Sequence, residues 1–224
     1  MKPLRARIPF AFAILLLAPA PAGSAEKPAP KPGDLLLLLA PRFMSHDAAK
    51  PIPRSGAAGP GATEIVPARI GLFGPEVLEP ADLAALGFGW DEFQRRAAAT
   101  GDLVLEILTT EIAKDARGIP THAILRGEGS MAVASVFAAG FLARFKDSLG
   151  DRLLVAAPDR DTLYVFPRAM PTFREFGKSI ASQFEDALYP ASIELLEIDS
   201  NGLRAAGSFL LLQENPQKFL TEDP

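Results

Sequence analysis

The chain has 224 residues, among them 23 basic residues, 27 acidic residues and no cysteine, and its net charge is −4. Without cysteine it has no disulfide, no thiol nucleophile and no thiolate metal site. The excess of acidic residues argues against nucleic acid and anionic membrane surfaces as partners, because proteins bind both through clustered Lys and Arg.

The N-terminus has the pattern of a secretory signal over residues 1–25. Lys2, Arg5 and Arg7 precede the apolar run IPFAFAILLLAPAPA, and the small residues GSA that follow suit cleavage. The apolar run is shorter than the roughly 20 residues of a membrane span. We therefore predict a mature chain that starts at Glu26, has no integral membrane span and is periplasmic or secreted. Cleavage leaves 20 basic and 27 acidic residues, a net charge of −7. An uncleaved membrane anchor is the alternative.

Residues 26–63 are rich in Pro, Ala and Gly and are predicted to form a linker, because such a composition propagates neither helix nor central strand. Leu35 to Ala40 interrupts this region with an apolar run that we expect to dock on the folded part as an edge strand or a short helix; its length does not separate the two. Residues 64–212 are predicted to form one α+β domain, and residues 213–224 a polar tail.

The first half of the predicted domain combines strands and helices. Pro67 in EIVPARIGLFG favours an edge strand, because proline cannot donate to a sheet. EPADLAALGFG predicts a short helix that has acidic residues in its first turn and ends at Gly87. A second helix starts with WDEFQRRAAA; it either continues through DLVLEILTTEIAKDARG or breaks at Thr100–Gly101, where the later residues would also suit a strand. IPTHAILRGEG predicts a strand and a turn.

The second half predicts two helices and two hairpins. Ser130 to Leu149 suits an apolar helix that Gly150 ends. LLVAAP and TLYVFP predict a hairpin, as do SIELLEI and LRAAGSF around DSNG. Between them, PTFREFGKSIASQFEDALYP predicts an amphipathic helix, with one apolar face formed by Phe173, Phe176, Ile180, Phe184 and Leu188. The predicted fold class is α+β: a mainly antiparallel sheet of hairpins covered by these two helices.

Metal, nucleophile and phosphate sites have little support in the sequence. His46 and His122 are 76 positions apart, and neither has a partner at ligand spacing. Ser130 follows a glycine turn but lacks the trailing glycine of a nucleophile elbow, and His122 is its only realistic base, so we expect it to cap a helix. Glu128 opposes anion binding at the same turn. We predict no metal ligand, cofactor or catalytic residue.

The turn PDRD, between the two strands of the first hairpin, holds the candidate binding residues Asp159, Arg160 and Asp161. In extended chain the two aspartates would point to one face and could share a proton or a cation, whereas in a tight turn such residues cap backbone amides. Arg160 would lower the pKa of both carboxyls, opposite to what a general acid requires. A structural turn with salt bridges, a binding role and a catalytic role all stay open.

The same hairpin carries a family resemblance. LLVAAPDRDTLYVFP, between an apolar and an amphipathic helix, resembles the region around the Pro-x-Arg-Asp turn of YtpQ-like proteins, a bacterial family of unknown function. EVLEPADLAALGFGWDEFQRRAAA is similar to the helix, turn and helix of that family. The resemblance covers Ile65 to Gly207 and is centred on Pro158, Arg160 and Asp161. The chain departs from the pattern at Gly101–Leu103, where the family has an Asn-Leu pair, and in its export signal. The resemblance implies a compact α+β fold and no reaction.

The function we predict is that of an exported, non-catalytic binding or interaction module for an unidentified protein or small molecule, because no nucleophile, base and metal set converge. Asp159, Arg160 and Asp161 would be its contact point. One alternative is a hydrolase that uses a divalent cation on Asp159 and Asp161, since oxygen ligands suffice for such a cation. The other is a passive structural component of the cell envelope, in which the proline-rich linker is a spacer.

Overall fold

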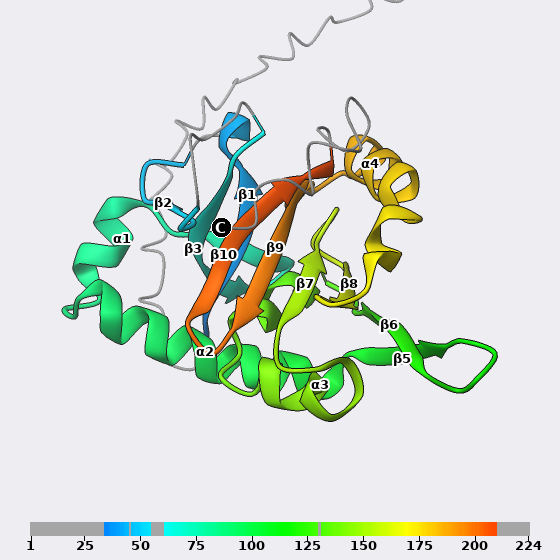
Figure 1. Cartoon of the computed structure of the whole chain (residues 1–224). Helices are drawn as coiled ribbons and strands as arrows, with labels where there is room; N and C mark the ends of the chain where they lie inside the picture. The colour runs from blue at the N-terminus through cyan, green and yellow to red at the C-terminus, as the bar shows by residue number, and fades with distance from the viewer. Residues whose placement is uncertain (1–33, 45, 55–60, 130, 210–224) are drawn as a thin grey trace, which may run out of the picture.

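A computed structural model of the chain describes residues 34–44, 46–54, 61–129 and 131–209 (Figure 1). The predicted signal peptide, Ser130 and the predicted polar tail lie outside the described residues. Two sheets and several helices make up the fold, so the predicted α+β class is confirmed, although the expected single sheet is in fact two.

The four-stranded sheet has β1 at one edge and β3 inside, in the order β1-β3-β2, with β4 also paired to β3. The six-stranded sheet has the order β10-β9-β7-β8-β6-β5. All strand pairs are antiparallel. The strands are β1 (Leu35–Pro41), β2 (Lys50–Pro51), β3 (Thr63–Gly71), β4 (Gly74–Val77), β5 (Thr109–Lys114), β6 (Pro120–Arg126), β7 (Leu153–Ala156), β8 (Thr162–Pro167), β9 (Glu194–Asp199) and β10 (Gly202–Ser208).

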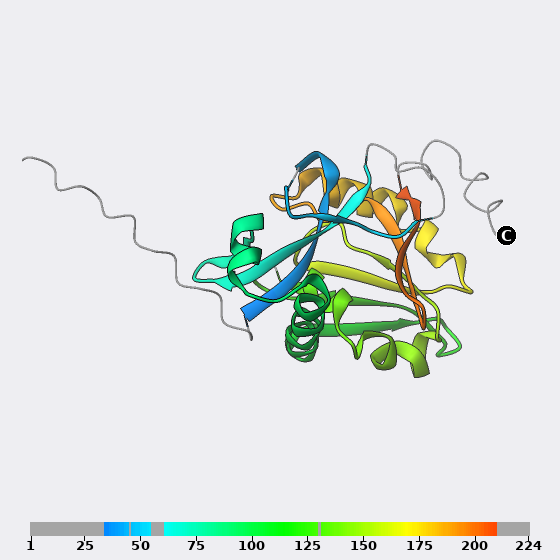
Figure 2. The ribbon, with the colours of Figure 1, turned by 90° about the vertical axis from the view of Figure 1, so that its left-hand side faces the viewer.

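Helices lie on both faces of the six-stranded sheet: α4 packs on one face and α3 on the other, while α2 packs mainly on β1 and η3. Figure 2 shows α4 above its strands, with α2 and α3 below them. Among the described residues, no helix combines the length and the apolar character needed to cross a membrane. The α-helices are α1 (Pro80–Ala85), α2 (Trp90–Ile107), α3 (Phe141–Leu149) and α4 (Gly177–Asp186), and the 3-10 helices are η2 (Arg42–Met44), η3 (Ala132–Phe137) and η4 (Pro171–Arg174).

Strand β1 is part of the core, although the sequence placed it in a linker. The apolar run docks as an edge strand, one of the two expected forms, and pairs with β3 from Leu35↔Arg69 to Pro41↔Thr63. All seven of its residues are buried. A strand buried on both faces needs no alternation of apolar and polar residues, which is why five consecutive leucines suit it. The expected domain start at residue 64 would separate β3 from this partner.

Strand β3 lies inside its sheet, so the edge position predicted from Pro67 is wrong. The carbonyl of Pro67 accepts a hydrogen bond from the N–H of Leu78 at 2.9 Å, on the side away from β1. The N and the C=O of a strand residue point to the same side, so the missing N–H of Pro67 also faces that side. There β2 pairs only up to Ile65 and β4 only from Ala68, and the proline occupies the gap between them.

Helices α1 and α2 follow the sequence signals. A capping box of Glu79 and Asp82 begins α1, and Gly87 follows it with a φ of 73°. The second helix continues through Thr100–Gly101 to Ile107 and does not break there. Gly101 is buried against η3: a Cβ at this position would lie 2.9 Å from the carbonyl oxygen of Ala134. Glycine therefore permits close contact between two backbones.

We expect Gly101→Ala to lower the free energy of unfolding by about 1–3 kcal/mol, the usual cost of overpacking a core. Helix propensity alone would predict a gain of up to about 1 kcal/mol. The measurement is chemical denaturation, with Ala99→Gly on an exposed position of the same helix as the control for propensity. If Gly101→Ala raised the free energy of unfolding by as much as Ala99→Gly lowered it, the result would contradict the close contact.

The predicted helix from Ser130 to Leu149 is two elements, η3 and α3, with Ala138 extended between them at ψ 135°. The cause is a contact with α2: Oδ1 of Asp102 accepts the N–H of Gly140 at 2.8 Å, just before α3. A carboxylate at a helix N-terminus satisfies an unpaired donor and favours a new helix start there. Gly150 ends α3 as predicted, with a φ of 95°.

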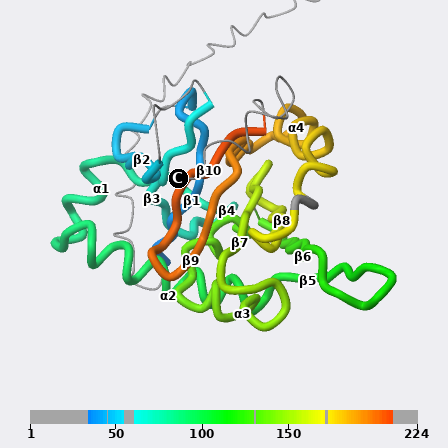
Figure 3. The backbone as a smooth tube through the Cα atoms, in the orientation of Figure 1, coloured from blue at the N-terminus to red at the C-terminus, as the bar shows by residue number. Residues whose placement is uncertain are grey.

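The predicted hairpins are all present, and α4 covers one of them. Strands β7 and β8 pair as expected, and β9 and β10 turn at Gly202, whose φ is 105°. The β5–β6 hairpin extends away from the body of the protein (Figure 3). The side chains of Phe173 on η4 and Ile180 on α4 pack into the apolar cluster, as predicted. Leu188 does not: α4 ends at Asp186, and Leu188 is 82% exposed.

Candidate functional site

Asp159 organises the turn between β7 and β8 in which the sequence placed the candidate site. Its Oδ1 accepts the backbone N–H of Asp161 at 2.8 Å, the arrangement of an Asx turn. Its Oδ2 accepts Nε2 of Gln183 on α4 at 2.6 Å, and Oε1 of Gln183 accepts the hydroxyl of Tyr164 at 2.9 Å. Both carboxylate oxygens of Asp159 therefore hold the turn together and tie it to α4.

Arg160 is a buried cation, with 6% of its surface exposed. Within the described part of the chain its Nε has no hydrogen-bond partner. Its guanidinium lies 5.3 Å from the ring centroid of Tyr189, a cation–π contact. Burial lowers the pKa of the Arg160 guanidinium, while Tyr189 and Asp161 act in the opposite direction. The surroundings therefore disfavour the charge that this side chain carries.

The three predicted residues lie together on one turn in different environments. Asp159 caps a backbone amide, as in the structural interpretation of the turn. Asp159 and Asp161 are half-buried, whereas Arg160 is buried. The described residues show the aspartate cap of this turn but no salt bridge of Arg160.

The histidines do not form a metal site in the described part of the chain, which contains no group of three or more His, Asp or Glu residues placed to hold an ion. His122 lies on β6 with its ring 4.7 Å from that of Phe176, and its Nδ1 is 3.1 Å from Oγ1 of Thr121. Burial lowers the pKa of His122. The ring is half-buried and packs edge-on against Phe176.

A pocket of about 410 Å³ opens beside the turn, where the end of α2 meets the start of β5 and the loop between β6 and η3. Its volume is within the range of small-molecule sites. Its lining surface is divided about evenly between polar and apolar atoms, and it includes one cation and one anion. The lining residues are Val104, Ile107, Leu108, Thr109, Arg126, Gly127, Glu128, Met131 and Ala132.

The turn supports the wall of this pocket through its backbone. The carbonyl of Asp161 accepts the N–H of Gly127 at 3.0 Å, and the carbonyl of Arg160 accepts the N–H of Val133 at 3.1 Å. These bonds fix both ends of the loop that lines the pocket. Of the lining residues only Glu128 was considered from the sequence, as a charge that opposes an anion; the apolar lining residues belong to no chemical motif.

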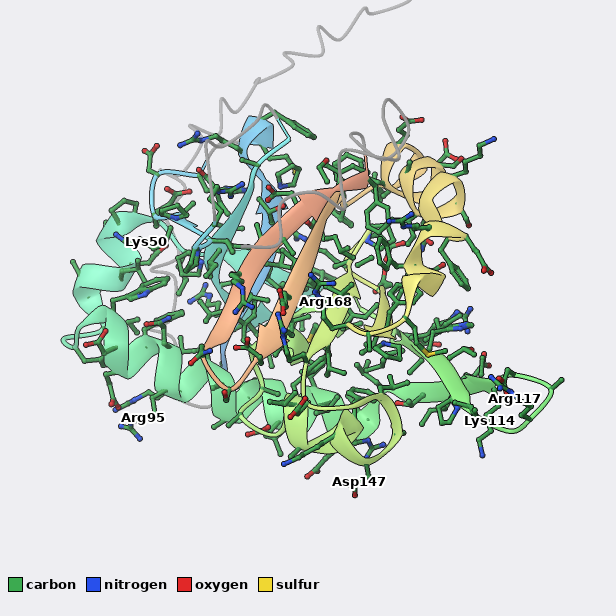
Figure 4. All side chains as sticks on the ribbon, in the orientation of Figure 1. Lys50, Arg95, Lys114, Arg117, Asp147 and Arg168 are labelled. Carbon is green, nitrogen blue, oxygen red and sulfur yellow. The ribbon has the colours of Figure 1, made fainter. Side chains whose placement is uncertain are left out.

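A second charged group lies on the same face of the six-stranded sheet as α4, because Glu197 pairs with Leu154 of the apolar cluster beneath that helix. Glu197 is buried, and its Oε1 lies 2.7 Å from Nη2 of Arg152, 3.0 Å from Nη2 of Arg204 and 3.9 Å from Nε of Arg168. Nη1 of Arg204 also contacts Asp199 at 3.0 Å. Arg168, labelled in Figure 4, directly follows the last residue of β8. Here, in contrast to Arg160, the buried charge is surrounded by opposite charges.

Comparisons with known proteins identified no similar protein. No protein-family model matches the chain, and no match was found among curated proteins or solved structures. The resemblance to YtpQ-like proteins therefore stays a prediction. The turn and the pocket are the features of the structure that bear on function.

Proposed function

We propose that this protein is an exported, non-catalytic binding module whose pocket beside the β7–β8 turn receives an apolar group of its partner. The observation that carries the proposal is the pocket itself: an open space of about 410 Å³ with Ile107, Leu108 and Met131 in its lining. Apolar lining gives binding energy by removing surface from water, and Arg126 and Glu128 offer polar contacts that orient a ligand. Export rests on the predicted signal.

In this proposal Asp159, Arg160 and Asp161 position the binding site and do not contact the ligand through their charges. Two carbonyls of the turn hold the loop that lines the pocket. The carboxylate of Asp159 is engaged with the turn and with α4. A change in the turn would therefore act on binding through the position of Gly127 and its neighbours.

The alternative of a cation-dependent hydrolase has less support. A cation on Oδ2 of Asp159 would displace the hydrogen bond of 2.6 Å from Gln183 and loosen the contact of the turn with α4. The guanidinium of Arg160, one residue away, would repel it. A passive envelope component has no need of an open pocket, and so the binding module accounts for more features of the structure.

The proposal predicts that N-acetylphenylalanine amide, a neutral probe with one aromatic ring, binds with a dissociation constant on the order of millimolar, as small ligands do. NMR titration should shift the amide signals of Leu108, Gly127 and Met131. Ile107→Glu should weaken binding at least about tenfold, because it places a charge beside an apolar ligand.

Leu103→Glu is the matched control for this titration. Leu103 lies one helical turn before Ile107 on α2 and is 62% exposed, but it is not part of the pocket lining. It should leave probe binding unchanged. Equal effects of the two substitutions, or the absence of shifts at these amides under conditions in which the chain is monomeric, would refute the pocket as the binding site.

A further inference from the structure

The tip of the β3–β4 hairpin exposes two large apolar side chains next to each other. Leu72 is 86% exposed and Phe73 is 98% exposed. The neighbouring Gly74 has a φ of 123°, which glycine adopts readily, so the tight turn holds both side chains away from the protein. An adjacent pair of this kind on a chain with a well-packed core indicates a contact with another molecule.

The hairpin tip lies beside the proposed binding pocket. A Cβ on Gly74 would be 3.6 Å from the carbonyl oxygen of Gly129, and Gly129 stands between the lining residues Glu128 and Met131. Phe73 nevertheless leaves the pocket of its own chain open, because it is almost fully exposed. One face of the protein therefore carries an apolar projection beside a recess of mixed polar and apolar lining.

A face with both features can bind a second copy of itself. In a two-fold contact the same patch meets on both subunits, so a projection from each copy enters the recess of the other. An engineered cavity of about 150 Å³ holds a benzene molecule, and a pocket of about 410 Å³ therefore has room for a phenylalanine ring. Arg126 and Glu128 line this pocket, and Nη1 of Arg126 lies 3.3 Å from Oε2 of Glu111 in the same chain, so the charge of Arg126 at the pocket rim is already paired.

We propose that the partner of the pocket is a second copy of this chain, with Phe73 of each copy in the pocket of the other. The inference rests on the proposed function, since it requires that the pocket binds an apolar group. It adds the identity of the partner, and with it an isologous dimer. In this dimer the apolar side chains at the tip of the β3–β4 hairpin are buried in the interface.

Sedimentation velocity over a range of protein concentrations tests the dimer. We expect a concentration-dependent dimer for the parent protein, and a dissociation constant at least about tenfold higher for Phe73→Ser and for Ile107→Glu, since aromatic anchors in pockets dominate such contacts. Leu188→Ser, at a residue that is 82% exposed and not part of the pocket lining, should dimerise like the parent. A monomer at every concentration, or a dimer that Phe73→Ser leaves intact, would overturn the inference.

Titration of the same variants with N-acetylphenylalanine amide separates this inference from the proposed function. Phe73→Ser should keep the pocket and bind the probe, whereas Ile107→Glu should lose both dimer and probe. A parent protein that is monomeric but binds the probe refutes the second copy as partner and leaves the proposed function in place. A parent protein that forms a dimer but shows no probe shifts in the Phe73→Ser variant refutes both.

Discussion

Replacement of Leu38 by alanine is expected to lower the free energy of unfolding by about 2–5 kcal/mol. Leu38 is fully buried in β1, opposite Val66 of β3. Strand β1 belongs to the same apolar cluster as α2 and the six-stranded sheet, so the cavity left by the substitution lies in the centre of the fold. Chemical denaturation of the parent and the variant measures the difference.

Leu188→Ala is the control for this measurement, because it removes the same atoms from a side chain that is 82% exposed. It should change stability by no more than about 0.5 kcal/mol. A chain that starts at Glu64 lacks β1 and should fail to show a cooperative unfolding transition. If Leu38→Ala proved as mild as the control, or the shortened chain folded, the domain would start where the sequence placed it.

Elements with local signals were predictable from the sequence, and elements set by distant contacts were not. The capping box of Glu79 and the glycine at 202 fix a helix start and a hairpin turn through their own backbone chemistry. In contrast, α3 starts where Asp102, 38 residues earlier, accepts the N–H of Gly140. The leucines of β1 have no period that distinguishes a doubly buried strand from a short helix, and surrounding prolines indicated a linker.

The candidate site was predictable only in part for the same reason. The sequence singled out the turn at Asp159 from its charges, and the Asx turn follows from residue type alone. The pocket combines α2, β5 and the loop after β6, and its lining consists of ordinary residues such as Ile107 and Met131. Only their placement in space makes them a site.

Replacement of Arg160 by methionine is expected to raise the free energy of unfolding by about 1–3 kcal/mol, the range seen when buried charges give way to apolar side chains. Arg160 is 6% exposed, its Nε has no partner among the described residues, and burial lowers the pKa of its guanidinium. Methionine keeps a long apolar side chain, while the contact with Tyr189 loses its cationic component. Thermal and chemical unfolding would measure the gain.

Arg204→Met makes the same chemical change at an arginine whose partners are present. Nη2 and Nη1 of Arg204 lie 3.0 Å from the carboxylates of Glu197 and Asp199, so its loss leaves buried Glu197 with fewer donors and should lower stability by about 1 kcal/mol. The two substitutions should therefore act with opposite signs. A loss in Arg160→Met equal to that in Arg204→Met would show that the guanidinium stabilises the turn. A gain in stability accompanied by weaker probe binding would instead mean that the protein bears a costly buried charge to hold its pocket in shape.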